Sequence, residues 1–210
     1  MKAFRSNKNR FEIYPESKQI WKFFQNQQDY IKELEIYIKS PAFAPEFFAS
    51  IPQQNMLKLQ LLKAKTLLEI KPDFAEIAQL FYQLHQLEPQ TICLCDTNPK
   101  NILYDTELKR YFLVDFSDWQ YLPKETDLIT FLLFWASIYS EADFVKAAIN
   151  FLSEYNKLAA IDWDNWQQIL PRASAAFDER RARFNHRKAI TAAEPLKNRE
   201  FMQKMENSLS

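Results

Sequence analysis

The chain contains no glycine in its 210 residues, although glycine makes up about 7% of an average protein. Because glycine alone adopts a positive φ without a steric penalty, every turn that needs this conformation must use Asn, Asp or a strained residue. The Walker A loop and the dinucleotide-binding fingerprint both require glycine where the backbone approaches phosphate. The sequence therefore excludes both of these phosphate-binding loops.

Cysteine is scarce as well, since Cys93 and Cys95 are the only two. In a strand, residues two apart point to the same face and lie too far apart for an easy disulfide. The sequence places no other ligand candidates beside them, so a metal site is not expected here. This cysteine usage is typical of a reduced, cytoplasmic protein.

The chain also lacks an excess of charge, with 27 basic and 27 acidic residues. A balanced charge does not favour nucleic acid or an anionic membrane surface as a partner. The longest apolar run, residues 128–139, is too short to span a bilayer and contains Thr130 and Ser137. We therefore expect a buried helix there, no membrane span and no nucleic-acid partner.

Hydrophobic residues make up 47% of the chain and aromatic residues 15%, enough for a substantial core. The front part is rich in strands: alternation predicts strands over 11–14 and 19–24, and a 3.6-residue period predicts a helix over 27–39. Residues 57–62 fit either a strand or a helix.

The rest of the chain is mostly helical. A helix opens at Pro72-Asp73 and stops at Pro89, a hairpin is expected over 102–104 and 111–114, and helices over 126–139, 141–158 and 163–170. The polar tail after Pro195 is expected to be frayed. His85 is interpreted as a structural or surface histidine. These patterns predict an α+β protein with a small, strand-rich front part over 1–60 and a mostly helical back part over 61–210.

Three polar residues stand where predicted strands end. Asp96 follows the apolar run T-I-C-L-C, Asn101 comes five residues later, and Asp115 ends the run Y-F-L-V. Phosphoryl transfer needs a carboxylate that orients the attacking hydroxyl, and oxygen ligands that hold Mg²⁺ against the phosphates. The three residues at these positions are typical of that chemistry.

This spacing resembles the catalytic and metal loops of the aminoglycoside phosphotransferase and choline kinase family, whose pattern is H-G-D-x-x-x-x-N followed by a strand and an Asp. The resemblance covers about residues 22–133 and is strongest over 92–119. The resemblance implies a two-lobed, protein-kinase-like fold, with ATP and Mg²⁺ as cofactors and a hydroxyl of a sugar or amino alcohol as acceptor. It also implies that Asp96 is the catalytic base and that Asn101 and Asp115 are the magnesium ligands. Asp127, followed by Leu128, matches a structural Asp-Leu pair that holds the catalytic loop.

The same resemblance asks for a strand lysine and a helix glutamate. Lys22, in I-W-K-F-F, would bind the nucleotide phosphates, and Glu33 is the first choice for its ion-pair partner, with Glu35 as the alternative. The family's glycine-rich loop is absent, and too few residues precede Lys22 for a full set of three strands. The comparison with the family therefore implies an abbreviated front lobe. The phosphates would therefore be held by lysine and magnesium, with at most a glycine-free hairpin above them.

A departure from the family pattern leaves the function open. Leu94 and Cys95 replace the family's His-Gly pair, so the alternative to a small-molecule kinase is a catalytically inactive, kinase-like nucleotide-binding or regulatory protein. A protein kinase is less favoured, because no A-P-E segment follows Asp115.

An arginine-rich stretch near the end of the chain is either an exposed helix or an anion-binding wall that would favour an anionic acceptor. Its residues are Arg172, Arg180, Arg181, Arg183, Arg187 and Lys188.

Overall fold

A computed structural model describes residues 2–6, 9–185 and 193–209 of the chain. The chain forms two compact units, each built from separate stretches of sequence. The first unit is Met1–Ile70 with Lys100–Trp119, and the second is Lys71–Pro99 with Gln120–Ser210. Residues 100–119 thus pack with the front part of the chain, and the predicted lobe boundary at residue 60 stays a prediction.

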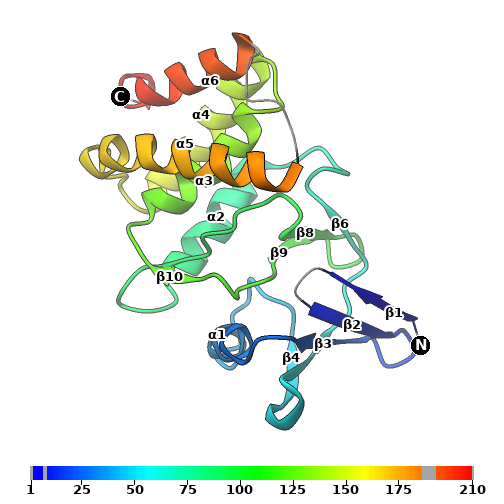
Figure 1. Cartoon of the computed structure of the whole chain (residues 1–210). Helices are drawn as coiled ribbons and strands as arrows, with labels where there is room; N and C mark the ends of the chain where they lie inside the picture. The colour runs from blue at the N-terminus through cyan, green and yellow to red at the C-terminus, as the bar shows by residue number, and fades with distance from the viewer. Residues whose placement is uncertain (1, 7–8, 186–192, 210) are drawn as a thin grey trace. The chain divides into compact units, whose positions relative to one another are not determined.

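An antiparallel five-stranded sheet forms the base of the first unit (Figure 1). Its order is β1-β2-β3-β5-β4, with β1 at Lys2–Arg5, β2 at Asn9–Tyr14, β3 at Gln19–Phe24, β4 at Phe47–Ile51 and β5 at Met56–Gln60. The strands expected over 11–14 and 19–24 are confirmed, and residues 57–62 are largely a strand. The expectation that three strands would not fit up to Lys22 is wrong, because β1 needs only four residues.

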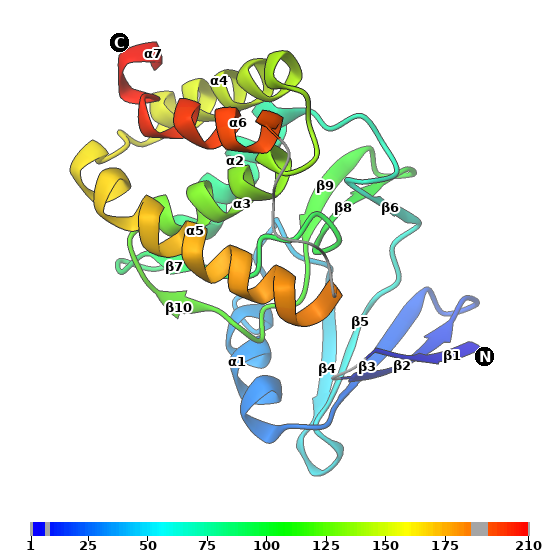
Figure 2. The ribbon, with the colours of Figure 1, turned by 45° about the horizontal axis from the view of Figure 1, so that its top comes forward.

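Helix α1 (Gln27–Tyr37) follows β3 directly and packs against β3 and β5 (Figure 2). Asn26 caps its start, accepting a hydrogen bond from the Gln28 N–H at 2.8 Å, which satisfies one of the free donors of the first turn. The buried face of the helix carries Glu33 among apolar side chains. This placement brings an acidic residue against the lysine-bearing strand.

A second, three-stranded sheet completes the first unit, with β6 (Ala64–Thr66), β8 (Ile102–Asp105) and β9 (Arg110–Leu113) in that order. The hairpin of β8 and β9 confirms the one expected from the sequence. Asp105 stabilises its turn by accepting from the N–H groups of Glu107 and Leu108, each at 2.8 Å. The Leu113 N–H donates to the Phe43 carbonyl at 2.7 Å, so β9 is tied to the segment after α1.

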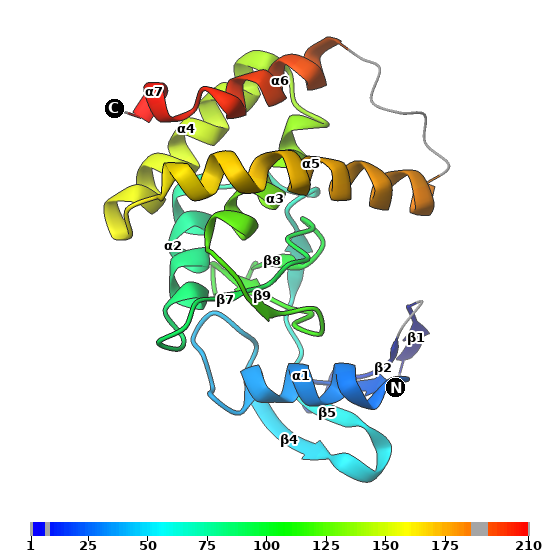
Figure 3. The same ribbon diagram turned by 60° about the vertical axis from the view of Figure 1, so that its left-hand side comes forward.

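The second unit is mostly helical (Figure 3). Phe81, Phe131 and Phe151 meet at its centre, from α2, α3 and α4. A short antiparallel pair, β7 with β10, completes the unit. The elements are α2 (Phe74–His85), β7 (Ile92–Cys93), β10 (Gln120–Tyr121), α3 (Glu125–Ala136), α4 (Glu141–Leu158), α5 (Trp163–Asn185), α6 (Ala193–Gln203) and α7 (Glu206–Leu209).

The end of the chain differs from the expectation of a frayed tail, because α6 packs onto α3 and α4. The buried Asn198 amide donates to the carbonyls of Ala136 and Tyr139, both at 3.1 Å. The Trp166 indole N–H donates to the Met202 carbonyl at 3.0 Å. Helix α5 also continues past Pro171 instead of stopping at 170. Tertiary contacts thus order a polar segment whose own sequence pattern is weak.

The α+β class expected from the sequence is confirmed by this arrangement of sheet and helices. In the part of the chain that the structure describes, no helix has both the length and the apolar character needed to cross a membrane.

The missing glycines leave a visible mark on the backbone. Asn55 and Asp115 adopt positive φ, as expected for Asn and Asp, but other residue types do so as well. Left-handed backbone costs roughly 1–2 kcal/mol for a residue with a Cβ atom. The others in the described chain are Lys18, Ser40, Cys95 and Lys109, with φ of 51°, 47°, 64° and 52°.

Candidate active site

Lys22 lies at the centre of a buried ion cluster in the first unit. It projects from β3, and its Nζ donates to both carboxylate oxygens of Glu33, at 2.9 and 2.7 Å. The same Nζ donates to Asp115 Oδ1 at 2.8 Å. The side chains of Lys22 and Glu33 are 5% and 1% exposed, whereas that of Asp115 is 38% exposed. Asp115 is therefore the solvent-facing member of the cluster.

The protonation of the cluster follows from burial and from its two carboxylates. Burial alone would lower the pKa of Lys22, but Glu33 and Asp115 outweigh it and raise that pKa. Burial raises the pKa of Glu33 to about 7, because the single lysine opposes it only in part. With all three groups ionised, the cluster carries one excess negative charge, which a cation at Asp115 would neutralise.

Asn101 lines the same cavity as Lys22, Glu33 and Asp115. The cavity is about 250 Å³, and its other walls are largely apolar: Phe11, Ile20, Tyr37, Pro45, Leu59, Gln60, Leu61, Leu62, Leu103 and Val114. The Val114 N–H donates to the Asn101 carbonyl at 3.0 Å, so the start of β8 and the end of β9 are held together. A carboxylate and an amide oxygen are suitable ligands for Mg²⁺, so these residues fit the expected metal.

Helix α1 is fastened to the segment after Asp115 by a reciprocal contact that the sequence did not indicate. Lys32 Nζ donates to the Trp119 carbonyl at 3.1 Å, and the Trp119 indole N–H donates to the Lys32 carbonyl at 2.8 Å. Lys32 directly precedes Glu33 in the chain. The contact therefore couples the position of Glu33 to the loop that carries Asp115. The only trace of this contact in the sequence is Trp119 itself, the last residue of the V-D-F-S-D-W run.

Asp96 belongs to the second unit, where it follows β7 and the positive-φ residue Cys95. Its side chain is 30% exposed and forms an ion pair with Arg180 of α5, with 3.2 Å between Nη1 and Oδ1. The next residue, Thr97, is buried and donates from its hydroxyl to Thr130 Oγ1 at 3.0 Å. Asp96 is thus a half-buried carboxylate on an anchored loop.

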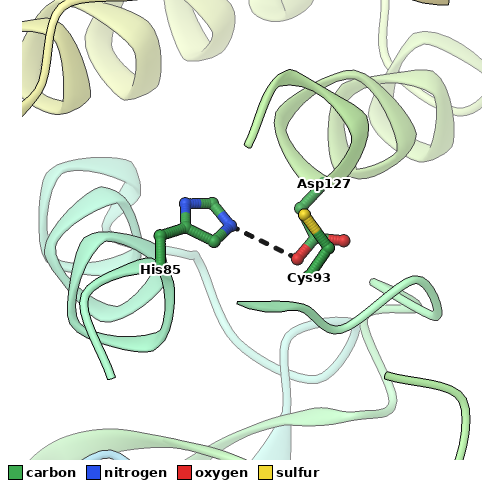
Figure 4. Close-up of side chains that lie close together, drawn as sticks. All are labelled: His85, Cys93 and Asp127. Atoms are coloured by element: carbon green, nitrogen blue, oxygen red, sulfur yellow. Dashed lines mark hydrogen bonds and ion pairs between the residues drawn. The ribbon is translucent and has the colours of Figure 1, made fainter. Parts of the chain in front are cut away.

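Asp127 holds the backbone that leads to Asp96, as the resemblance implied. Its Oδ2 accepts from the Leu94 N–H at 2.6 Å, and its Oδ1 accepts from the Cys95 N–H at 2.9 Å. His85 also contacts Asp127, through Nε2 at 3.4 Å from Oδ2 (Figure 4). Of the two interpretations of His85, structural or surface, its burial supports the structural one. Its partner could not be read from the sequence.

Cys93 lies beside His85 and Asp127, close enough that the three groups could in principle share a metal ion. Burial raises the pKa of the Cys93 thiol, with the Asp127 charge adding to the effect. The protonated thiol donates to the carbonyls of Leu122 and Pro123, at 3.4 and 3.3 Å. Because metal binding requires the thiolate, the three residues are better described as a hydrogen-bonded cluster.

The residues singled out from the sequence thus fall into two groups. Lys22, Glu33, Asn101 and Asp115 gather around one cavity of the first unit, and Glu35 is exposed on α1. Asp96 lies in the second unit with Arg180. Of the arginine-rich stretch, Arg172 and Arg180 are exposed and Arg181 is half-buried. The side chain of Arg183 and residues Arg187 and Lys188 lie outside the described part.

The sequence matches no protein-family model and no curated protein. The fold, in contrast, is similar to solved structures of small-molecule kinases. Choline kinase LicA from Streptococcus pneumoniae is 15% identical with a TM-score of 0.60, covering 98% of this chain and 91% of that one. A choline/ethanolamine kinase family protein from Mesorhizobium loti is 12% identical with a TM-score of 0.57, covering 97% and 92%.

An aminoglycoside phosphotransferase from Alicyclobacillus acidocaldarius is 8% identical with a TM-score of 0.62, covering 100% of this chain and 90% of that one. Similarity over nearly the whole of each chain confirms the fold inferred from the sequence. The chain has the protein-kinase-like α+β fold of the choline kinases and aminoglycoside phosphotransferases.

Proposed function

We propose that the protein is an ATP- and Mg²⁺-dependent phosphotransferase that transfers the γ-phosphoryl group to a hydroxyl of a small molecule. The observation that carries the proposal is the buried ion cluster of Lys22, Glu33 and Asp115 beside Asn101 on one cavity. Burying two charged groups, with a third packed against them, is costly. Binding of a nucleotide and its metal would explain why the protein keeps this cluster despite its cost.

Each residue of the cluster has a role in this proposal. Asn101 and Asp115 would hold Mg²⁺, which would supply positive charge against the phosphates when bound. Lys22 would bind the phosphates through its ammonium group, and Glu33 keeps that group in place. The apolar walls of the cavity suit the base of the nucleotide.

Asp96 is proposed as the catalytic base, which orients the acceptor hydroxyl and accepts its proton. Asp96 is half-buried, and the backbone that precedes it is anchored. It therefore satisfies the geometric requirement for this role better than a solvated loop residue would.

The β1–β2 hairpin carries no glycine, so phosphate binding depends on the lysine and the metal.

Calorimetric titration with Mg²⁺ and ATP, followed by an ATP-consumption assay on a panel of alcohols and sugars, tests the proposal. Asp96→Asn is expected to abolish turnover while nucleotide still binds. Asp115→Ala is expected to lose magnesium-dependent binding. Asp118→Asn, a neighbouring turn residue, is the matched control and should retain both. An Asp96→Ala protein with wild-type turnover would remove Asp96 from the mechanism.

The ion pair between Arg180 and Asp96 supports an anionic acceptor, such as a phosphorylated or acidic sugar. A guanidinium group on the catalytic carboxylate must be drawn aside before a hydroxyl can approach. An anionic group on the acceptor can do this, because it offers the guanidinium a bidentate partner. A cationic amino alcohol such as choline would instead be repelled by Arg180.

Comparing choline with a phosphorylated sugar as acceptors decides between these classes. We expect turnover with the phosphorylated sugar, and Arg180→Gln should raise its KM by about tenfold or more, as the loss of one charged hydrogen bond would do. Arg172→Gln, an exposed arginine on the same helix, is the control. Turnover on choline that Arg180→Gln leaves unchanged would contradict an anionic acceptor.

The second candidate function is a kinase-like protein that binds nucleotide without turnover. It is favoured by Leu94 and Cys95 in place of the family's His-Gly pair, and by the engagement of Asp96 with Arg180. Tight binding of Mg²⁺ and ATP, with no ATP consumption on any acceptor and none after Arg180→Gln, would select this alternative.

A further inference from the structure

We propose that His85 is a positioning residue that acts with Tyr155 through Asp127 to fix the backbone preceding Asp96. The inference rests on the proposed function, since it assigns His85 a part in presenting the catalytic base. It concerns residues of the second unit alone: α2 supplies His85, α3 supplies Asp127 and α4 supplies Tyr155.

The contacts form a continuous chain. The Tyr155 hydroxyl lies 2.6 Å from His85 Nδ1, and His85 Nε2 lies 3.4 Å from Asp127 Oδ2. Asp127 then accepts from the N–H groups of Leu94 and Cys95, at 2.6 and 2.9 Å. Asp96 is the next residue after Cys95, so the chain of contacts ends one peptide bond from the proposed base.

The direction of the hydrogen bonds follows from the groups themselves. A carboxylate only accepts, so His85 Nε2 must carry a proton and donate to Asp127. In the neutral imidazole, Nδ1 is then an acceptor and takes the proton of the Tyr155 hydroxyl. Burial raises the pKa of Tyr155, with nearby acidic groups adding to it, so this hydroxyl stays protonated and able to donate. Every bond thus has one donor and one acceptor.

Burial makes the chain of contacts rigid. His85 is 1% exposed and Asp127 and Tyr155 are fully buried, so water cannot replace a missing partner. In such surroundings, a buried carboxylate that loses a donor is left under-satisfied and must move toward another donor. That movement would alter the two N–H bonds that hold residues 94 and 95.

The segment before Asp96 needs this external support. Leu94 offers no polar side-chain atom, and Cys95 stands at φ 64°, a strained conformation for a residue with a Cβ atom. Leu94 stands where the H-G-D-x-x-x-x-N pattern of the similar family has its histidine. His85 therefore brings an imidazole to the same stretch of backbone from helix α2.

Three variants test the inference. His85→Phe keeps the ring and removes both nitrogens, His85→Gln returns an N–H donor that can reach Asp127, and Tyr155→Phe removes one oxygen only. Tyr82→Phe is the control, because Tyr82 packs edge-on against Tyr155 and loses the same atom. Each is compared with wild type by amide hydrogen exchange at Leu94 and Cys95, and by kcat and KM for ATP.

His85→Phe should exchange these two amides about tenfold faster or more and lower kcat about 10- to 100-fold. KM for ATP should change by less than about twofold, since nucleotide binding is not disturbed. His85→Gln should restore most of both properties. Tyr155→Phe should also speed exchange and lower kcat, by smaller factors, so it serves as the test if His85→Phe does not fold. Tyr82→Phe should match wild type.

Wild-type exchange at both amides in folded His85→Phe, or in Tyr155→Phe if His85→Phe does not fold, would overturn the inference. So would an unchanged kcat in an active background. If wild type transfers no phosphate to any acceptor, the proposed function fails, and the exchange data alone decide whether His85 positions the segment. Equal losses in His85→Phe and His85→Gln would indicate a packing role only.

Discussion

The carboxyl group of Glu33 should make stability depend on pH. Its pKa rises from 4.5 to about 7 in the folded protein, so the folded state binds the proton more tightly than the unfolded state. The resulting contribution to stability is complete below pH 4.5 and is lost as the pH rises through about 7. Other acids titrate nearby, so the effect is isolated by comparison with Glu33→Gln.

We therefore expect the free energy of unfolding of wild type, relative to Glu33→Gln, to fall as pH rises across this range. Urea unfolding at a series of pH values measures the difference. Glu35→Gln, on the exposed side of α1, is the control and should show no such trend. Curves for wild type and Glu33→Gln that stay parallel would mean that Glu33 keeps an ordinary pKa.

Lys109 tests what the absence of glycine costs. It is exposed in the turn between β8 and β9 with φ 52°, where glycine would carry no steric penalty. Lys109→Gly should stabilise the protein by about 1 kcal/mol. Lys109→Ala keeps the Cβ atom and should give no gain. Chemical denaturation of both variants measures the effect, and equal stabilities would show that this turn is not strained.

At the scale of elements, the contact between α1 and Trp119 should control nucleotide binding. Trp119→Phe removes the indole N–H that bonds the Lys32 carbonyl and loosens the helix that carries Glu33. Because one hydrogen bond contributes about 1 kcal/mol, the Kd for Mg²⁺ and ATP should rise about fivefold. Calorimetric titration measures this change.

Trp21→Phe is the matched control for that prediction. Trp21 lies on β3 next to Lys22, and its indole N–H donates only to the nearby Gln19 side chain at 3.2 Å among the contacts described. The same chemical change there should leave nucleotide affinity near the wild-type value. If both variants bind equally well, the position of α1 does not depend on Trp119.

Elements with strong local patterns could be predicted from the sequence, and elements held by distant contacts could not. Helix α2 follows from its apolar spacing and the Asp73 cap, which accepts from Ala75 and Glu76. Helix α6 lacks such a pattern and depends on Asn198, whose partners lie about sixty residues earlier. The short strand β1 is exposed along its length, so burial left no alternation to detect.

The candidate site shows the same division. The spacing of Asp96, Asn101 and Asp115 could be read directly, because each residue lies in a loop close to the end of a strand. The ion pair of Lys22 with Glu33 depends on which face of α1 is buried, and the sequence left Glu35 as an alternative. The partner of Asp96 could not be predicted, since Arg180 lies 84 residues away.

At the scale of the whole molecule, ligand binding should appear as added stability. A ligand that binds only the folded state stabilises it by about 2.7 kcal/mol at a hundredfold excess over Kd. Mg²⁺ with ATP should therefore raise the Tm of wild type, whereas ATP with a chelator should raise it much less. Lys22→Met should lose the shift, and Lys58→Met on β5 is the control. A shift in Lys22→Met equal to wild type would place the nucleotide elsewhere.

The pairing of Arg180 with Asp96 has a consequence for the protein at rest. A carboxylate engaged by a guanidinium group is a poor base, and so it would not readily activate a water molecule. Under the proposed function, ATP would then not be hydrolysed until the acceptor binds and forms its own contact with Arg180. The same ion pair that selects the acceptor would thereby suppress ATP hydrolysis when no acceptor is bound.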